Sequence, residues 1–387
     1  MKKIFVFILI ILFTQGLTGE TFLELVENGT PEEIQVLLKK GIAINSKDID
    51  TETPLMKAAS ENKNPEIIHI LIKAGALLES RNFLDKTAIM YSASSNGNAQ
   101  VTSVLVEAGA DINARDSGGC TPLMYAARYN ENPEVINVLL DAGANISDRS
   151  TDGSTALMEA ATFNENPEVI SILLKAGAKL ESKDHLGRTP LFLSAGFNEN
   201  IQITTILLKA GAEISVREWG GLTPLMYAAQ FNKNPEIVET LINAGTDISD
   251  QDENGQTALM KATDNENIEV LTTLLKYGAN INDRTYSGLT TLIIAVWNSA
   301  FYKEKTESIV LLLNEGVKID ARDNNGKTAL MWASQLQQHT EVISILLKAG
   351  ADAKIKDNSG KKALDYAKEN LKIKGTDIYW ELNDKSF

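Results

Sequence analysis

The side chains that most often carry out catalysis or bind metals are sparse in this sequence. It contains one cysteine, Cys120, and three histidines, His69, His185 and His339. A nucleophile needs a base within hydrogen-bond reach, and a zinc site needs several ligands gathered in one place. The histidines lie far apart along the chain, and the glycines form no phosphate-binding loop. We therefore expect no enzyme active site, no metal site and no cofactor, and we interpret Cys120 as a bystander at a loop tip.

The methionines, in contrast, form a regular series. Apart from Met1, each of them follows the same three-residue marker, and most recur at intervals of 34 residues: Met56, Met90, Met124, Met158, Met226, Met260 and Met331. One interpretation is a ladder of sulfur atoms that binds metal or scavenges oxidants. The other is a flexible apolar side chain that fills space between stacked repeats. We favour the second, since thioethers about 10 Å apart on successive repeats could not share one ion.

The marker, Thr-(Pro/Ala)-(Leu/Ile), defines a repeat that runs through the chain. It begins at Thr53, Thr87, Thr121, Thr155, Thr189, Thr223, Thr257 and Thr328, with degenerate copies at Thr290 and Lys362. Residues 21–41 have the same shape without the marker. Each unit is interpreted as two helices: the threonine caps the first, and a glycine such as Gly143 ends the apolar second. About eleven such units must stack, because no unit can bury its apolar faces alone.

A second phrase, aromatic-Asn-x-Asn-Pro-Glu, lies between the two helices of most units. Residues 129–134 read YNENPE. We interpret Asn130 as an αL residue that ends the first helix. Asn132 is expected to be the N-cap of the second helix, with Pro133 at its first position and Glu134 in its first turn. The phrase then forms the turn between the two helices and is not a recognition motif.

Two units differ in length from the others. The phrase supplies the residue by which most units exceed 33, and the Thr257 unit, which lacks the proline, is one residue shorter. The Thr290 unit has four extra residues. We expect them to lengthen its first helix or to form a bulging loop that carries Phe301 and Tyr302.

These residues resemble the ankyrin repeat. In the Thr121 unit the resemblance is carried by Asp116, Gly119, Thr121, Pro122, Leu123, Ala126, Ala127, Leu139, Leu140, Gly143 and Ala144. It implies an all-α solenoid of about eleven stacked ankyrin-type helix-turn-helix repeats with projecting hairpin-like loops. It also implies a concave surface, built from loop tips and first helices, that binds a partner. The methionine series departs from the family, which usually has histidine at that position.

Charge and the N-terminus narrow the setting in which the protein works. With 37 basic and 51 acidic residues the net charge is −14, which argues against nucleic acid as a partner. Lys2 and Lys3 precede ten apolar residues, 4–13, as in a secretory signal. We expect a signal peptide over residues 1–19, with an uncleaved anchor as the alternative, and no membrane insertion after its removal. The mature protein would be periplasmic or secreted, and the Lys, Ile and Asn usage suggests a bacterium.

The expected repeat domain covers residues 20–387. It comprises an N-terminal capping unit at 20–50, internal repeats at 51–360 and a C-terminal capping unit at 361–387. Positions four, seven and eight residues after each marker threonine share one face of the first helix. The candidate protein-binding residues at these positions are Tyr125, Arg128, Tyr129, Phe163, Phe197, Tyr227, Phe231, Trp297 and Trp332.

The loop tips supply the remaining candidates, which are Phe83, Leu186, Trp219, Leu222, Tyr286 and Leu289. Exposed Trp and Tyr side chains are the usual anchors of interfaces. The alternative is that the rings of the first helices pack on one another and seal the floor of a groove.

The sequence therefore favours an exported scaffold, not an enzyme, that binds a protein partner of unknown identity and is itself a monomer. The alternative function is a non-catalytic accessory that stabilises or regulates an exported or periplasmic enzyme.

Overall fold

The computed structural model describes residues 19–301, 306–336 and 340–386. Residues 1–18 of the expected signal peptide and Tyr302 lie outside these ranges. The chain divides into two compact units, Met1–His185 and Leu186–Phe387. Within the described residues the regular elements are the 22 helices α2–α23, with one isolated antiparallel bridge between Arg284 and Thr290. The prediction of an all-α solenoid of eleven helix pairs is confirmed.

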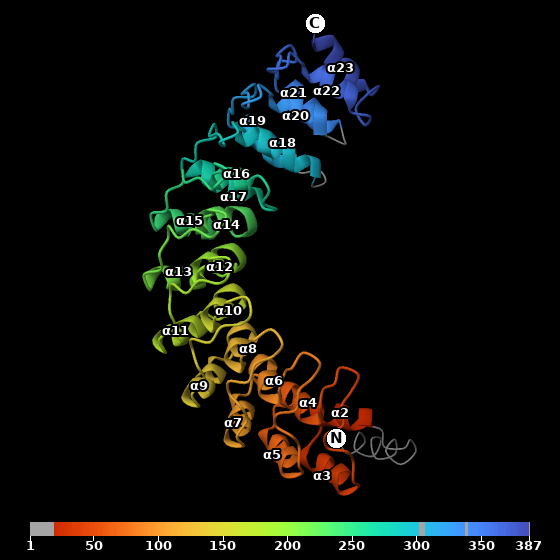
Figure 1. The fold of residues 1–387 in the computed structure, drawn as a ribbon, viewed down its shortest axis with the longest axis vertical. Coiled ribbons are helices and arrows are strands. Elements are labelled where there is room, and N and C mark those ends of the chain that lie inside the picture. Colours follow the sequence, from red (N-terminus) through yellow and green to blue (C-terminus); the bar gives the residue numbers. More distant parts are fainter. Residues whose placement is uncertain (1–18, 302–305, 337–339, 387) are drawn as a thin grey trace. The chain divides into compact units, whose positions relative to one another are not determined.

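In the first unit, five helix pairs stack as two rows (Figure 1). The first helices of the pairs are α2 (Gly19–Asn28), α4 (Pro54–Glu61), α6 (Ala88–Ser95), α8 (Pro122–Tyr129) and α10 (Ala156–Phe163). The second helices are α3 (Pro31–Lys39), α5 (Pro65–Lys73), α7 (Ala99–Glu107), α9 (Pro133–Asp141) and α11 (Pro167–Lys175).

In the second unit, six pairs are built in the same way. The first helices are α12 (Pro190–Phe197), α14 (Pro224–Phe231), α16 (Ala258–Ala262), α18 (Thr291–Phe301), α20 (Ala329–Leu336) and α22 (Ala363–Glu369). The second helices are α13 (Ile201–Lys209), α15 (Pro235–Asn243), α17 (Ile268–Lys276), α19 (Glu307–Asn314), α21 (Glu341–Lys348) and α23 (Asp377–Lys385).

The predicted helix caps are present in the Thr121 repeat, whereas the marker Thr87 makes no side-chain cap bond. Thr121 accepts a hydrogen bond from the backbone N–H of Met124 (3.4 Å), and Asn132 accepts one from Glu134 (3.0 Å). Gly143, at φ 95°, ends the second helix of this pair in the left-handed region, where a residue without Cβ is favoured. The Met124 side chain is 2% exposed, and the other six methionines of the series are equally buried. This burial supports their interpretation as packing side chains.

Asn130 corrects one sequence interpretation. It is extended (φ −89°, ψ 121°), not αL. Its buried Nδ2 donates to the carbonyl oxygens of Ala93 and Asn96, both at 3.0 Å, which belong to the end of α6 in the preceding repeat. Its Oδ1 accepts from the backbone N–H of Asn132 (3.0 Å). The side chain thus satisfies carbonyl groups that a helix end leaves without an intrahelical partner.

The same contact recurs along both units, and we call the set the asparagine ladder. Each member donates to two carbonyls of the preceding repeat: Asn62, Asn96, Asn130 and Asn164 in the first unit, and Asn232 and Asn265 in the second. Buried amides that bridge repeats in this way fix the distance between neighbours as well as the turn inside each repeat.

The ladder also corrects the explanation of the short Thr257 repeat. Asn265 keeps its two bonds, and Asn267 still caps α17 by accepting from Glu269 N–H. The missing residue is therefore not in the Asn-x-Asn turn. It is lost from the first helix, since α16 has five residues where α14 has eight. In the long Thr290 repeat the prediction of a longer first helix is confirmed, because α18 has eleven residues.

The hairpin-like loops are joined by a second series of contacts that the sequence analysis did not anticipate. Arg115 Nη1 donates to Gly119 O within its own hairpin (3.0 Å) and to Arg149 O in the next hairpin (2.6 Å). Gln251 makes the equivalent pair of bonds through Nε2, to Gly255 O and Arg284 O, both at 3.0 Å. These side chains hold successive hairpins at a fixed spacing.

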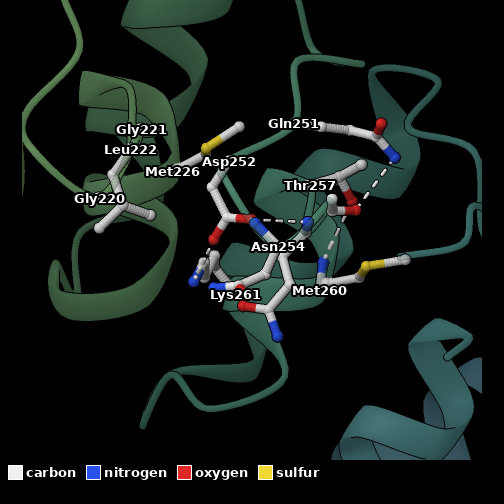
Figure 2. A network of polar contacts seen from close by, with 12 residues as sticks. Gly220, Gly221, Leu222, Met226, Gln251, Asp252, Asn254, Thr257, Met260 and Lys261 are labelled. Carbon is white, nitrogen blue, oxygen red and sulfur yellow. Dashed lines mark hydrogen bonds and ion pairs between the residues drawn. The ribbon is translucent and has the colours of Figure 1, made fainter. Parts of the chain in front are cut away.

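An acidic residue closes most hairpins from inside. Figure 2 shows Asp252, whose Oδ1 accepts from the backbone N–H groups of Asn254 (2.9 Å) and Gln256 (2.8 Å). Its Oδ2 forms an ion pair with Lys261 Nζ at 2.8 Å, four residues after the N-cap Thr257. The first helix and the hairpin before it are therefore locked together.

Candidate functional site

In each unit the candidate site is the surface formed by the hairpins and by the solvent-facing side of the first helices, and we call its helical part the first-helix face. Tyr129, Phe163, Phe197 and Phe231 are the last residues of α8, α10, α12 and α14, respectively. Their side chains are between 45% and 54% exposed. A terminal residue packs on only one side, which leaves the other side of each ring open to a partner.

Residues four positions after the marker threonine are placed differently. Tyr125 is half-buried and donates its hydroxyl to Asp116 Oδ2 (2.6 Å), and Trp332 Nε1 donates to Asp323 Oδ2 (3.0 Å). Burial, followed by the hydrogen bond to Asp116, raises the pKa of Tyr125. These polar atoms lock the hairpin as Lys261 does, so only the ring faces of Tyr125 and Trp332 remain for contact with a partner.

In the first unit, one cation organises the exposed rings. The Arg128 guanidinium carbon lies 3.8 Å from the ring centroid of Phe163 and 5.1 Å from that of Tyr129. Its Nη1 donates to Glu159 Oε2 at 3.2 Å, and Glu159 is almost completely buried. Burial raises the pKa of Glu159, and the charge of Arg128 opposes that rise. Arg128, predicted as a contact residue, therefore also positions Phe163.

In the second unit, Tyr227 is the centre of an aromatic cluster. Its ring centroid lies 4.5 Å from Phe192, 5.3 Å from Phe197 and 4.7 Å from Phe231. Gly196 makes this possible, because a Cβ on Gly196 would lie 2.2 Å from Tyr227 Cδ1. The sequence indicates this packing of Tyr227 through the glycine at position 196, because the equivalent positions of other repeats hold Arg128 and Gln230. The predicted ring series is thus partly packed and partly exposed.

Trp297 and Trp332 form a separate pair. Their rings are nearly parallel, with centroids 6.0 Å apart and an interplanar angle of 11°. Lys327 Nζ lies 4.6 Å from the Trp332 ring and 4.4 Å from the Tyr366 ring. The sequence analysis missed Lys327, which directly precedes the marker threonine and looked like an ordinary surface charge.

The hairpin tips carry the most exposed large side chains of the candidate set. Trp219 is 72% exposed and Tyr286 66%, and Phe83 and Leu186 also occupy turns. The placement of Leu222 and Leu289 at tips was wrong. Each is half-buried in the stem of its hairpin, where its carbonyl accepts a backbone bond from Glu218 (3.2 Å) or Thr285 (3.0 Å). Cys120 lies in a stem for the same reason.

A hollow of about 500 Å³ lies beside Tyr129 in the first unit. Its lining is mixed in polarity and comes from the ends of α6 and α8 and the turns after the first helices: Lys63, Ser94, Ser95, Gly97, Tyr129, Asn130, Glu131 and Asn132. A side chain of a bound protein could enter it next to the exposed tyrosine ring.

The described cysteine lies in a stem of a hairpin in the first unit. Cys120 is half-buried, and burial followed by the charge of Asp116 raises the pKa of its thiol to about 11. Within residues 19–301, 306–336 and 340–386, no group of three or more His, Cys, Asp or Glu side chains is arranged to hold a metal ion. Across the same ranges, no helix has the length and apolar character needed to cross a bilayer.

The comparisons agree with the helix-pair architecture. The family description "Ankyrin repeats (3 copies)" matches residues 77–150, 123–218, 225–302 and 292–378, and "Ankyrin repeat" matches residues 50–83. No curated protein sequence matches the chain. The crystal structure of the human ASB11 ankyrin repeat domain is similar in fold, with a TM-score of 0.52 and 23% identity, covering 59% of this chain and 99% of that one. Since the family matches extend through most of the chain, this protein belongs to the ankyrin repeat family.

Proposed function

We propose that the protein is an exported, non-catalytic scaffold that binds a protein partner through its first-helix face and hairpin tips. The family is generally one of protein–protein interaction scaffolds. The observation that carries the proposal is the set of half-exposed rings at the ends of α8, α10, α12 and α14, each supported from below by packed side chains.

Supported, exposed rings suit an interface for two reasons. A ring held in place before binding loses little conformational freedom on contact, which lowers the entropic cost of association. Aromatic side chains, phenylalanine included, are also enriched in protein interfaces relative to the rest of the surface. Phe163, fixed by Arg128, and Phe197, fixed by Tyr227, meet both conditions.

The remaining parts of the proposal rest on different observations. The raised pKa and half-burial of Cys120 favour a non-catalytic role. Export rests on the basic and apolar N-terminal sequence alone, and we propose that the protein acts as a monomer outside the cytoplasm. N-terminal sequencing of protein from cells should give a start near Glu20, and a full-length cytosolic product would contradict export.

The binding proposal is tested by co-purification of the tagged full-length chain with its partner, followed by titration of the two purified proteins. The variants are Phe163→Ala and Phe197→Ala, which should weaken binding at least about tenfold. The matched control is Val36→Ala, because Val36 is equally exposed but lies on the second helix α3.

Three outcomes are informative. Weakened binding by the ring variants, with Val36→Ala unchanged, supports the proposal. If Phe163→Ala unfolds early and binds as well as the wild type, the rings are core residues and the first-helix face is not the site. If the captured protein is an enzyme whose activity falls when this chain is removed, the scaffold serves as its accessory.

A further inference from the structure

The hairpin tips of the second unit form one rigid row. The backbone N–H of each tip residue donates to a carbonyl of the preceding hairpin: Trp219 to Leu186 (3.1 Å), Glu253 to Gly220 (3.4 Å) and Tyr286 to Asn254 (3.2 Å). Arg217 adds side-chain bonds to Gly221 O (2.7 Å) and Gln251 O (2.8 Å). The tips are therefore held at the spacing of the repeats rather than moving independently.

Each tip side chain lies over a glycine of the preceding hairpin. A Cβ on Gly221 would lie 2.9 Å from Glu253 Cγ, and one on Gly255 would lie 2.9 Å from Tyr286 Cδ1. Both glycines also have positive φ, 77° and 80°, which other residues rarely adopt. Because the glycines leave room, each side chain lies against the hairpin before it, and we call this row of successive tip residues the tip strip: Trp219, Glu253 and Tyr286.

The tip strip consists of a carboxylate with one aromatic ring on the hairpin before it and one on the hairpin after it. Trp219 and Tyr286 are the most exposed rings of the candidate set. Glu253 is exposed and makes no ion pair within the described residues. A cation bound to the carboxylate would have an exposed aromatic ring on the hairpin before it and another on the hairpin after it, and both kinds of group attract Lys and Arg side chains.

The surroundings of the tip strip carry a matching charge. Residues 186–290 contain 13 acidic and 7 basic residues, so their net charge is 7 − 13 = −6. Ion pairs engage Arg217 with Asp250, Lys233 with Glu266 and Lys261 with Asp252. A positively charged segment is therefore drawn to this part of the molecule, and a negatively charged one is repelled.

We propose that the tip strip binds a basic segment of the partner protein, with a Lys or Arg side chain paired with Glu253 and the flanking residues of the segment against Trp219 and Tyr286. This inference rests on the proposed function and adds the chemistry of the partner. Apolar residues next to the basic one would cover the rings. The segment would run along the row of tips, because the row is continuous in that direction.

The test uses the full-length chain and two fluorescein-labelled probe peptides, three repeats of Gly-Lys-Leu-Lys and three repeats of Gly-Glu-Leu-Glu, followed by fluorescence anisotropy. The lysine peptide should bind, and more weakly as salt is raised, whereas the glutamate peptide should not. Trp219→Ala and Glu253→Gln should each weaken binding about fivefold.

The controls separate the tip strip from general acidity. Trp380→Ala removes another exposed tryptophan, in the C-terminal helix α23, and Glu315→Gln removes another exposed carboxylate, at the end of α19. If these control substitutions weaken binding of the lysine peptide as much as the tip substitutions do, binding is non-specific and the inference fails. Circular dichroism of each variant confirms that it is folded.

The natural partner distinguishes this inference from the proposed function. If the partner binds the wild type and loses affinity with Trp219→Ala but not with Glu253→Gln, the tip strip holds an apolar segment. That result overturns the proposal of a basic segment and leaves the proposed function standing. A full-length chain that captures no partner under any condition overturns the proposed function instead.

Discussion

Substitution of Asn130 by alanine should destabilise the protein far more than substitution of Asn132, although both asparagines belong to the same turn. Asn130 is 3% exposed and makes three hydrogen bonds, two to carbonyls of the preceding repeat and one from Asn132 N–H. Asn132 is half-exposed, caps α9 and donates to Gly97 O (2.9 Å) at the surface.

The magnitudes follow from what each truncation leaves behind. Asn130→Ala leaves two buried carbonyls and one part-buried N–H without a partner, and at about 1 kcal/mol for each group the cost is about 3 kcal/mol. Asn132→Ala removes the N-cap bond from Glu134 N–H and the bond to Gly97 O, and water can replace both at the surface, so the cost is about 1 kcal/mol. The expected difference is therefore about 2 kcal/mol.

Urea unfolding followed by circular dichroism measures the difference, and native-state hydrogen exchange at the Asn132 amide reports the lost bond directly. A repeat array can unfold in steps, so the exchange rate serves where the transition is not two-state. A cost for Asn130→Ala no greater than that for Asn132→Ala would refute the asparagine ladder as a source of stability.

A further variant checks the same reasoning through charge. Asn130→Asp keeps the oxygen that accepts from Asn132 but places a carboxylate oxygen against two carbonyl oxygens. Ionisation is disfavoured there, so the folded-state pKa of the new carboxyl should be raised above its unfolded value of about 4. The variant is destabilised when the carboxyl is ionised. The difference in unfolding free energy between Asn130→Asp and wild type should therefore shrink as pH falls toward about 4.

Three further predictions concern single side chains. Met124→Leu should fold normally and cost less than about 1.5 kcal/mol in urea melts, because Met124 is a buried packing residue of similar volume; a larger loss would show that its sulfur has another role. Cys120, with a thiol pKa near 11, should react with iodoacetamide at pH 8 at least about tenfold more slowly in the native protein than in urea, and equal rates would contradict its burial. For Asp357, burial alone would raise the pKa of the carboxyl, but hydrogen bonds, led by that from Tyr366, lower it to about 2. The ionised carboxylate therefore stabilises the fold fully above the unfolded pKa of about 4, and this contribution is lost as pH falls to about 2. The difference in unfolding free energy between wild type and Asp357→Asn, measured in urea melts, should close over that range.

The fold could be predicted from the sequence because its determinants are local and repeated. Thr121, Pro122 and Gly143 act within their own helix ends, and the structure places them as the capping rules require. Asn130 was misread because its partners lie 34 and 37 residues away. A local rule can assign a backbone conformation to such a residue, but it cannot show that the side chain reaches the next repeat.

The candidate site was predictable in position but not in detail. Counting from the marker threonine places Tyr129, Phe163, Phe197 and Phe231 at the same position of their respective first helices, and they are exposed there. The count could not show that Arg128 covers one face of Phe163, or that the Tyr125 hydroxyl donates a hydrogen bond to Asp116, nine residues earlier. Glu253 was passed over because, in an acidic chain, one more carboxylate looks like solvated surface until its neighbours on the adjacent hairpins are known.

The asparagine ladder also has a consequence for how such a gene can change in length. Both repeats of unusual size differ at the same place: α16 is shortened and α18 lengthened at the end of the first helix. In the shorter repeat that change lies before Asn265, whose two bonds to the preceding repeat are kept. Small insertions and deletions should therefore survive selection at this point and be lost within the Asn-x-Asn turn. Duplication or excision of whole repeats, which restores every bond to an equivalent partner, is the other change that the array can absorb, so its reach can evolve in steps of one repeat.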